Sequence, residues 1–119
     1  MPQRDVRHWL WDVRFSCDLI LEATKGLSFE QFVADRMKRS GVEREFEIIA
    51  EAMKRTLELE TGLSLRFPQI KGIIDFRNIL AHGYHVVNYE KVWPIILHDL
   101  PVLRKSADEI LRERPPPNT

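Results

Sequence analysis

The chain has 119 residues, of which 44% are hydrophobic and 30% are charged. This length suits one compact domain with a hydrophobic core, and the hydrophobic content excludes an intrinsically disordered chain. The 18 Lys and Arg residues balance the 18 Asp and Glu residues, so a formal net charge of +0 excludes the overall positive field of a general nucleic-acid-binding protein.

The first predicted helix runs from about residue 4 to residue 25, and Gly26 ends it, because Gly adopts the left-handed C′ conformation most easily. Its apolar residues recur at steps of three and four, as a buried stripe requires. Ser28 and Gln31 form a capping box that starts a short second helix. The residues expected to be buried in these two helices are Val6, Leu10, Val13, Cys17, Ile20, Phe29, Phe32 and Val33.

A third helix is predicted from about Gly41 to Glu60, with Gly62 as its stop. Pro68 suits the first turn of a fourth helix, which we expect to end at Gly83. These two helices carry the polar residues that bear on function.

The fifth predicted helix begins at Asn88, a good N-cap residue, and runs to about Arg112. Pro94 and Pro101 each remove a helical hydrogen bond, so we expect this helix to bend or break near them. The proline-rich residues 115–119 are expected to be a disordered tail. The sequence therefore predicts an all-α, up-and-down bundle of about five helices, with a single domain over residues 1–114.

Cys17 is the only cysteine, so neither an internal disulfide nor a cysteine-based metal site is possible within the chain. The first eleven residues are charged and lack the apolar run of a signal peptide. No apolar stretch approaches the roughly 20 residues of a membrane helix. We therefore expect a cytoplasmic protein without a membrane partner.

The most distinctive polar pattern is Arg77-Asn-Ile-Leu-Ala-His82-Gly-Tyr84. Arg77 offers a rigid fork of donors for phosphate oxygens, and a histidine exchanges protons near neutral pH. Together they could cleave RNA without a metal. On an unbroken helix they would sit roughly 140° apart, so a shared target requires the helix to end near His82, as Gly83 allows. The alternative is an ordinary capped helix end with a surface ion pair.

This motif resembles the Arg, four residues, His, any residue, Tyr signature of the HepT-like toxins of the HEPN superfamily. Residues 28–32, 42–52 and 92–101 resemble three further helices of that family, so the resemblance covers roughly residues 5–112. It implies a metal-independent endoribonuclease that acts as a homodimer on RNA and needs no cofactor. Arg77 and His82 would be catalytic, with Asn78 in support.

The family's usual partner is a minimal nucleotidyltransferase antitoxin, which can adenylylate the motif tyrosine, here Tyr84. By resemblance, cleavage of tRNA or mRNA would proceed by attack of the 2′-hydroxyl and leave a 2′,3′-cyclic phosphate. Three positions depart from the family pattern: residues 69–72 lack a Trp, Asn88 stands where an Asp is expected, and Ala50 replaces a Gly. They keep open an alternative, a catalytically weak or silent accessory subunit that binds the nucleotidyltransferase.

Other residues have two interpretations. Glu51 either orients Arg77 or pairs with Arg55 at the i,i+4 spacing, and Glu47 fits a solvated face better. A metal site would require the remaining histidines to converge with carboxylates, which their spacing does not impose, so we expect no metal. Aromatic residues could stack bases but more often pack in a core or dimer interface. The histidines are His8, His85 and His98, and the aromatic residues are Trp9, Trp11 and Trp93. Tyr89 is expected to pack at a helix start.

Overall fold

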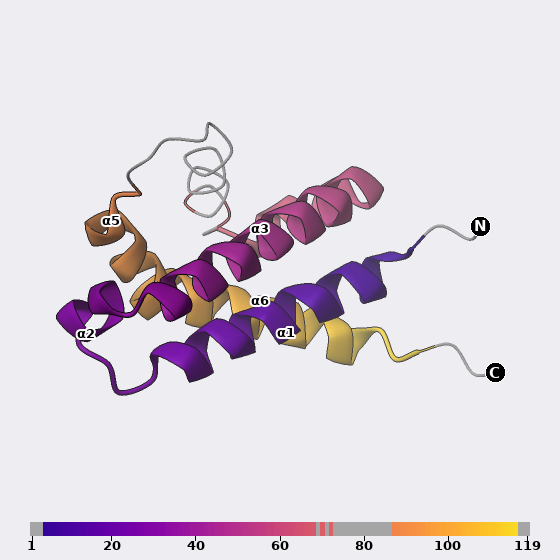
Figure 1. The fold of residues 1–119 in the computed structure, drawn as a ribbon. Helices are drawn as coiled ribbons and strands as arrows, with labels where there is room; N and C mark the ends of the chain where they lie inside the picture. Colours follow the sequence, from indigo (N-terminus) through magenta and orange to yellow (C-terminus); the bar gives the residue numbers. More distant parts are fainter. Residues whose placement is uncertain (1–3, 69, 71, 73–86, 117–119) are drawn as a thin grey trace.

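A computed structural model of the protein describes residues 4–68, 70, 72 and 87–116 (Figure 1). Over these residues it contains helices and no strand, which confirms the predicted all-α class. In chain order the elements are α1 (Val6–Thr24), α2 (Phe29–Ala34), α3 (Arg36–Leu59), the 3-10 helix η1 (Thr61–Arg66), α5 (Tyr89–Pro94), the π-helix η2 (Ile95–Asp99) and α6 (Leu100–Glu113).

Reciprocal caps set the beginnings of the first two helices. Asp5 accepts a hydrogen bond from the backbone N–H of His8, and the His8 ring accepts one from the backbone N–H of Asp5. Gly26 follows α1 with a φ of +76°, as predicted. The capping box of Ser28 and Gln31 is also confirmed, with bonds of 3.1 and 2.8 Å.

The predicted start of the third helix at Gly41 is wrong. Asp35 ends α2 and caps α3 by accepting a bond of 3.0 Å from the backbone N–H of Lys38, so α3 begins at Arg36. Gly41 lies inside the helix, because one exposed glycine costs a helix only about 1 kcal/mol relative to Ala.

The end of α3 at Leu59 lies one residue from its predicted position. Gly62 was predicted to end this helix in the left-handed conformation, but it does not adopt a positive φ. It lies instead within η1, a short helix that the sequence did not predict. Beyond Phe67 and Pro68, the structure describes Ile70 and Gly72 as helical, while the rest of the predicted fourth helix lies outside the described residues.

The C-terminal helix is divided near its prolines, as predicted. Asn88 caps α5 by accepting a 3.1 Å bond from the backbone N–H of Glu90, and α5 ends at Pro94. The π-helix η2 joins it to α6, in which Pro101 lies in the first turn and is therefore tolerated.

The core lies between α1, α3 and α6, which run alongside one another in Figure 1. Ion pairs of 2.9 Å (Arg14–Asp108) and 3.0 Å (Arg104–Asp18) connect α1 with α6. The described ends of the chain lie at the same end of the bundle. No helix in the described part of the chain is long and apolar enough to cross a membrane. The fully buried large side chains include Leu10, Ile20, Phe32, Phe46, Ile49, Met53, Phe67, Leu100, Leu103 and Ile110.

Candidate functional site

The predicted catalytic and modified residues, Arg77, Asn78, His82 and Tyr84, lie outside the described residues. The structure does describe the residues on both sides of this motif, and it places Glu51 on α3. The described part of the candidate site therefore consists of Glu51 and of the segments that precede and follow the motif.

On the N-terminal side, the chain is held in the core through Phe67, which is 1% exposed, and through Ile70, which packs against the core. Gly72 approaches η2 closely, because a Cβ atom at this position would lie 3.4 Å from a carboxylate oxygen of Asp99. Gly72 therefore lies beside the side chain of Asp99 in η2, at a distance that would leave a Cβ atom in ordinary van der Waals contact.

On the C-terminal side, Tyr89 is the main anchor. Its hydroxyl donates a 2.8 Å hydrogen bond to Glu43 of α3, and its ring packs edge-on against Phe32 at 5.9 Å between centroids. The Arg39 guanidinium lies over the same ring, 5.5 Å from its centroid. Burial, together with the bond to Glu43, raises the pKa of Tyr89 to about 12, so the phenol is neutral and acts as a donor. This confirms Tyr89 as a packing residue.

Glu51 makes the i,i+4 pair that was one of its two interpretations. Its carboxylate accepts a 2.9 Å bond from Nε of Arg55, and Arg55 also reaches Glu58 at 3.3 Å. Glu47 is exposed and pairs with Arg44 at 3.3 Å, as expected for a solvated face. A role of Glu51 in orienting Arg77 stays a prediction.

Two of the family departures have a local structural explanation. Ala50 is 1% exposed, so its methyl group is accommodated in the core. Asn88 caps α5, a role that Asn and Asp perform about equally well. Neither residue therefore disturbs the framework.

The position of the Trp93 ring is explained by its packing against other aromatic side chains of the same chain. Its ring stacks on Phe32 at 5.2 Å and meets Phe29 edge-on at 6.1 Å, so it belongs to the aromatic cluster around Tyr89. Trp9 lies beneath the Arg4 guanidinium, 4.1 Å from the ring centroid.

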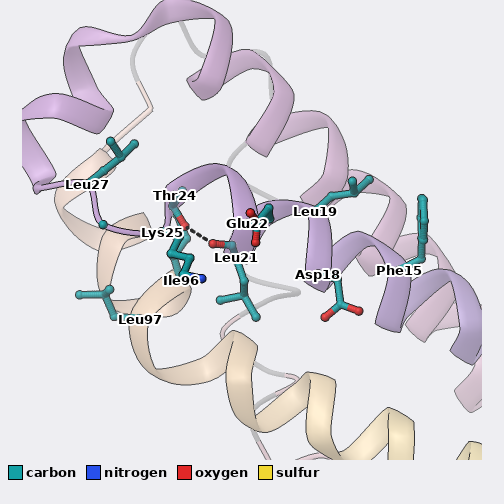
Figure 2. Close-up of a pocket in the computed structure, with 11 residues that line it drawn as sticks. Phe15, Asp18, Leu19, Leu21, Glu22, Thr24, Lys25, Leu27, Ile96 and Leu97 are labelled. Atoms are coloured by element: carbon teal, nitrogen blue, oxygen red, sulfur yellow. Dashed lines mark hydrogen bonds between the residues drawn. The ribbon is translucent and has the colours of Figure 1, made fainter.

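Other titratable groups lie elsewhere in the described part of the chain. No group of three His, Cys, Asp or Glu side chains converges there as metal ligands would. Cys17 is fully buried, and that burial raises the pKa of its thiol far above the usual range, so it is not a nucleophile. A groove beside α1, shown in Figure 2, contains Asp18, Glu22 and Lys25 but no histidine.

Sequence reasoning missed the bond between Tyr89 and Glu43 and the approach of Gly72 to Asp99. Both join residues far apart in the chain, and no local pattern encodes such pairs. The only available signal was the aromatic character of Tyr89 at a helix start.

The family model and the individual relatives that match this chain agree with one another. The family model described as "Ribonuclease HepT-like" matches residues 14–110. The chain is 32% identical to "Putative RNase MJ0127" of Methanocaldococcus jannaschii, over 95% of this chain and 93% of that protein. It is 36% identical to "Putative RNase TTE0752" of Caldanaerobacter subterraneus (90% and 95% covered) and 27% identical to "Probable ribonuclease HepT" of Thermococcus cleftensis (91% and 97% covered). No solved structure matches significantly.

Proposed function

Since the chain belongs to the HepT-like ribonuclease family of the HEPN superfamily, we propose that it is a metal-independent endoribonuclease toxin that acts as a homodimer on tRNA or mRNA. The observation that carries the proposal is the family match over residues 14–110, a range that includes the whole motif from Arg77 to Tyr84. The relatives named as ribonucleases cover nearly the full chain, which supports the same activity.

In the proposed reaction, His82 acts as general base and takes the proton of the RNA 2′-hydroxyl. The 2′-oxygen attacks the adjacent phosphorus, and the bond from phosphorus to the 5′-oxygen breaks. The partner subunit's His82 gives a proton to that leaving oxygen. The products are a 2′,3′-cyclic phosphate and a 5′-hydroxyl.

Arg77 stabilises the negative charge that builds on the phosphate oxygens during this displacement. Asn78 and Glu51 support the site, with Glu51 acting on Arg77 from α3. The two-fold axis of a homodimer explains how one histidine per chain provides both an acid and a base. A shared site requires each chain to hold its motif on a rigid support. Phe67 and Tyr89 support this arrangement, because they fix the residues on both sides of the motif to the core.

We further propose that a minimal nucleotidyltransferase antitoxin neutralises the enzyme by adenylylating Tyr84. The phenol oxygen attacks the α-phosphorus of ATP, pyrophosphate leaves, and the phenol loses its proton. The added AMP brings bulk and negative charge close to Arg77 in sequence, where it would compete with the RNA phosphate.

The test is to incubate the purified protein with total tRNA and with mRNA in EDTA. The wild type should cleave and leave cyclic-phosphate ends, and His82→Ala should cleave about 10²–10⁴-fold more slowly. His98→Ala is the matched control, since this histidine is exposed on η2, and it should retain full activity. A His82→Ala variant that cleaves at the wild-type rate would contradict the mechanism.

A catalytically weak or silent accessory subunit is the second candidate, favoured by the net charge of +0 and by the missing Trp in residues 69–72. It predicts no RNA cleavage, even when mass spectrometry shows Tyr84 to be unmodified. It also predicts tight binding to the nucleotidyltransferase. Cleavage by the isolated wild type would exclude it.

A further inference from the structure

The guanidinium group of Arg39 on α3 has no polar partner. Its Nε atom is buried and donates no hydrogen bond, and within the described residues the side chain forms no ion pair. The carboxylates of Asp35 and Glu43, one turn away on either side, are engaged elsewhere. Asp35 accepts the backbone N–H of Lys38 at 3.0 Å. Glu43 accepts the hydroxyl of Tyr89 at 2.8 Å. A half-buried cation without an acceptor is unfavourable, so this side chain requires an explanation.

A second unpaired arginine lies beside it. Arg36, three residues earlier on α3, is exposed, and its side chain also makes no ion pair or hydrogen bond within the described part of the chain. Each of the other arginines that the structure describes donates to a carboxylate or carbonyl oxygen. Both exceptions lie at the start of α3, whose first turn contains no acidic residue and where the helix dipole disfavours cations. An anion from outside the chain would stabilise this arrangement.

The ring of Tyr89 holds the Arg39 guanidinium in place, 5.5 Å from the ring centroid. Contact with the face of a ring uses none of the N–H donors of an arginine. Only Nε of Arg39 is both buried and unsatisfied, so its terminal nitrogens remain accessible. These nitrogens form a fork that matches two oxygens of one phosphate group. Arg39 is therefore oriented for an anion before the anion arrives.

The contact with Tyr89 also connects Arg39 to the end of the Arg77–Tyr84 motif. Tyr89 follows Tyr84 by five residues, and a chain of five residues spans at most about 18 Å. A strand of RNA bound at the motif carries a phosphate at every nucleotide, so phosphates beside the cleaved bond come within reach of Arg39. Because the formal net charge is +0, affinity for RNA must come from local cations of this kind.

We propose that Arg39 binds a backbone phosphate of the RNA to one side of the cleaved bond, and that Arg36 adds a second positive charge along the same strand. This inference rests on the proposed ribonuclease function, and it assigns Arg39 to substrate binding and not to proton transfer. Phosphate contacts position a nucleic acid without reading its sequence. Arg39 is therefore a substrate-positioning residue that acts on RNA of any sequence.

The test is Arg39→Met, which removes the charge and keeps a long apolar side chain over Tyr89. The probe is a fluorescein-labelled, single-stranded RNA with 2′-O-methyl groups, which cannot be cleaved by attack of a 2′-hydroxyl. Anisotropy titrations at several salt concentrations give the dissociation constant and its salt dependence. Arg39→Met should raise the dissociation constant about tenfold. The slope of its logarithm against the logarithm of salt concentration should become shallower by about 0.7, the value for one phosphate contact to a single strand.

Arg44→Met is the matched control, because it removes the same charge from the same helix. Arg44 lies roughly 140° around α3 from Arg39 and pairs with Glu47 at 3.3 Å, so this variant should keep the wild-type dissociation constant and slope. Arg39→Lys keeps the charge and loses the fork, and it should bind with intermediate affinity and the wild-type slope. All variants should retain the helical circular dichroism of the wild type, which separates a binding role from a structural one.

Cleavage of RNA with free 2′-hydroxyls is measured in parallel, so that the two proposals can fail separately. A wild type that cleaves, with an Arg39→Met variant of unchanged dissociation constant, slope and KM, would overturn the inference and leave the proposed function intact. A wild type that does not cleave but binds the probe through Arg39 would contradict the proposed function and retain the phosphate contact. Polyglutamate is the competing ligand: if Arg39→Met weakens its binding and leaves RNA binding unchanged, Arg39 binds an acidic protein and the RNA contact is wrong.

Discussion

The anchor at Tyr89 leads to a prediction of measurable size. Tyr89→Phe removes only the hydroxyl that donates to Glu43 and leaves the ring contacts with Phe32 and Arg39 in place. A hydrogen bond to a charged group contributes roughly 1.5–3 kcal/mol. Because Glu43 is only half-buried and water can replace the hydroxyl, we expect a loss at or just below the lower limit of that range, about 1–1.5 kcal/mol.

The assay is urea and thermal unfolding followed by circular dichroism at pH 7. For a chain of this size the expected loss lowers Tm by about 3–6 °C. Glu47→Gln is the matched control on the same helix, since its exposed pair with Arg44 at 3.3 Å should contribute less than about 0.5 kcal/mol. A double-mutant cycle with Glu43→Gln should show that the two changes do not add.

The same bond has a pH signature. The folded pKa of Tyr89 is raised to about 12, above the ordinary value of roughly 10, so its contribution is complete below pH 10. The contribution is lost as pH rises from about 10 to 12, and Tyr89→Phe should lack this component. Strict additivity in the cycle, or a Tyr89→Phe variant as stable as the wild type, would refute the reasoning.

Three further predictions concern stability. Phe46→Ala should lower the free energy of unfolding by about 3–5 kcal/mol in urea titrations, because the side chain is fully buried, and a loss below about 1 kcal/mol would contradict its place in the core. Ser28→Ala should cost about 1 kcal/mol by removing the bond to the backbone N–H of Gln31, whereas Ser28→Asp, which retains a capping oxygen, should be nearly neutral in the same titration. The hydrogen bond from Arg14 holds the pKa of Asp108 below its usual range, so its contribution to stability is present above about pH 4 and lost as pH falls further; Asp108→Asn should flatten the acid side of the Tm–pH profile, and an unchanged profile would argue against this pair.

Local signals in the sequence predicted much of this fold. The Ser28 capping box, the stop at Gly26 and the disruption near Pro94 and Pro101 each depend on backbone chemistry within a few residues, and all are confirmed. The cap at Asp35 was missed, because Gly41 was interpreted as a boundary although a helix tolerates one glycine.

At the candidate site, too, the sequence could indicate contacts between residues close in the chain but not contacts between distant ones. The pair of Glu51 with Arg55 lies one turn apart on a helix and was one of two stated interpretations. The bond from Tyr89 to Glu43 spans 46 residues, and only tertiary packing brings these two groups together. The roles of Arg77, His82 and Tyr84 depend on residue chemistry and family membership, and the experiments proposed above test them.

The pairing of α1 with α6 has a consequence for synthesis of the protein. The first helix is complete at Thr24, but its partner begins only at Leu100, after the whole middle of the chain has been translated. At about 5–20 residues per second, the interval from Thr24 to Leu100 takes roughly 4–15 s. Throughout that time the buried residues of α1 lack α6, which packs against α1 in the folded chain. A ribosome that stalls before α6 therefore releases a chain with an open core, so the folded bundle appears only at the end of translation.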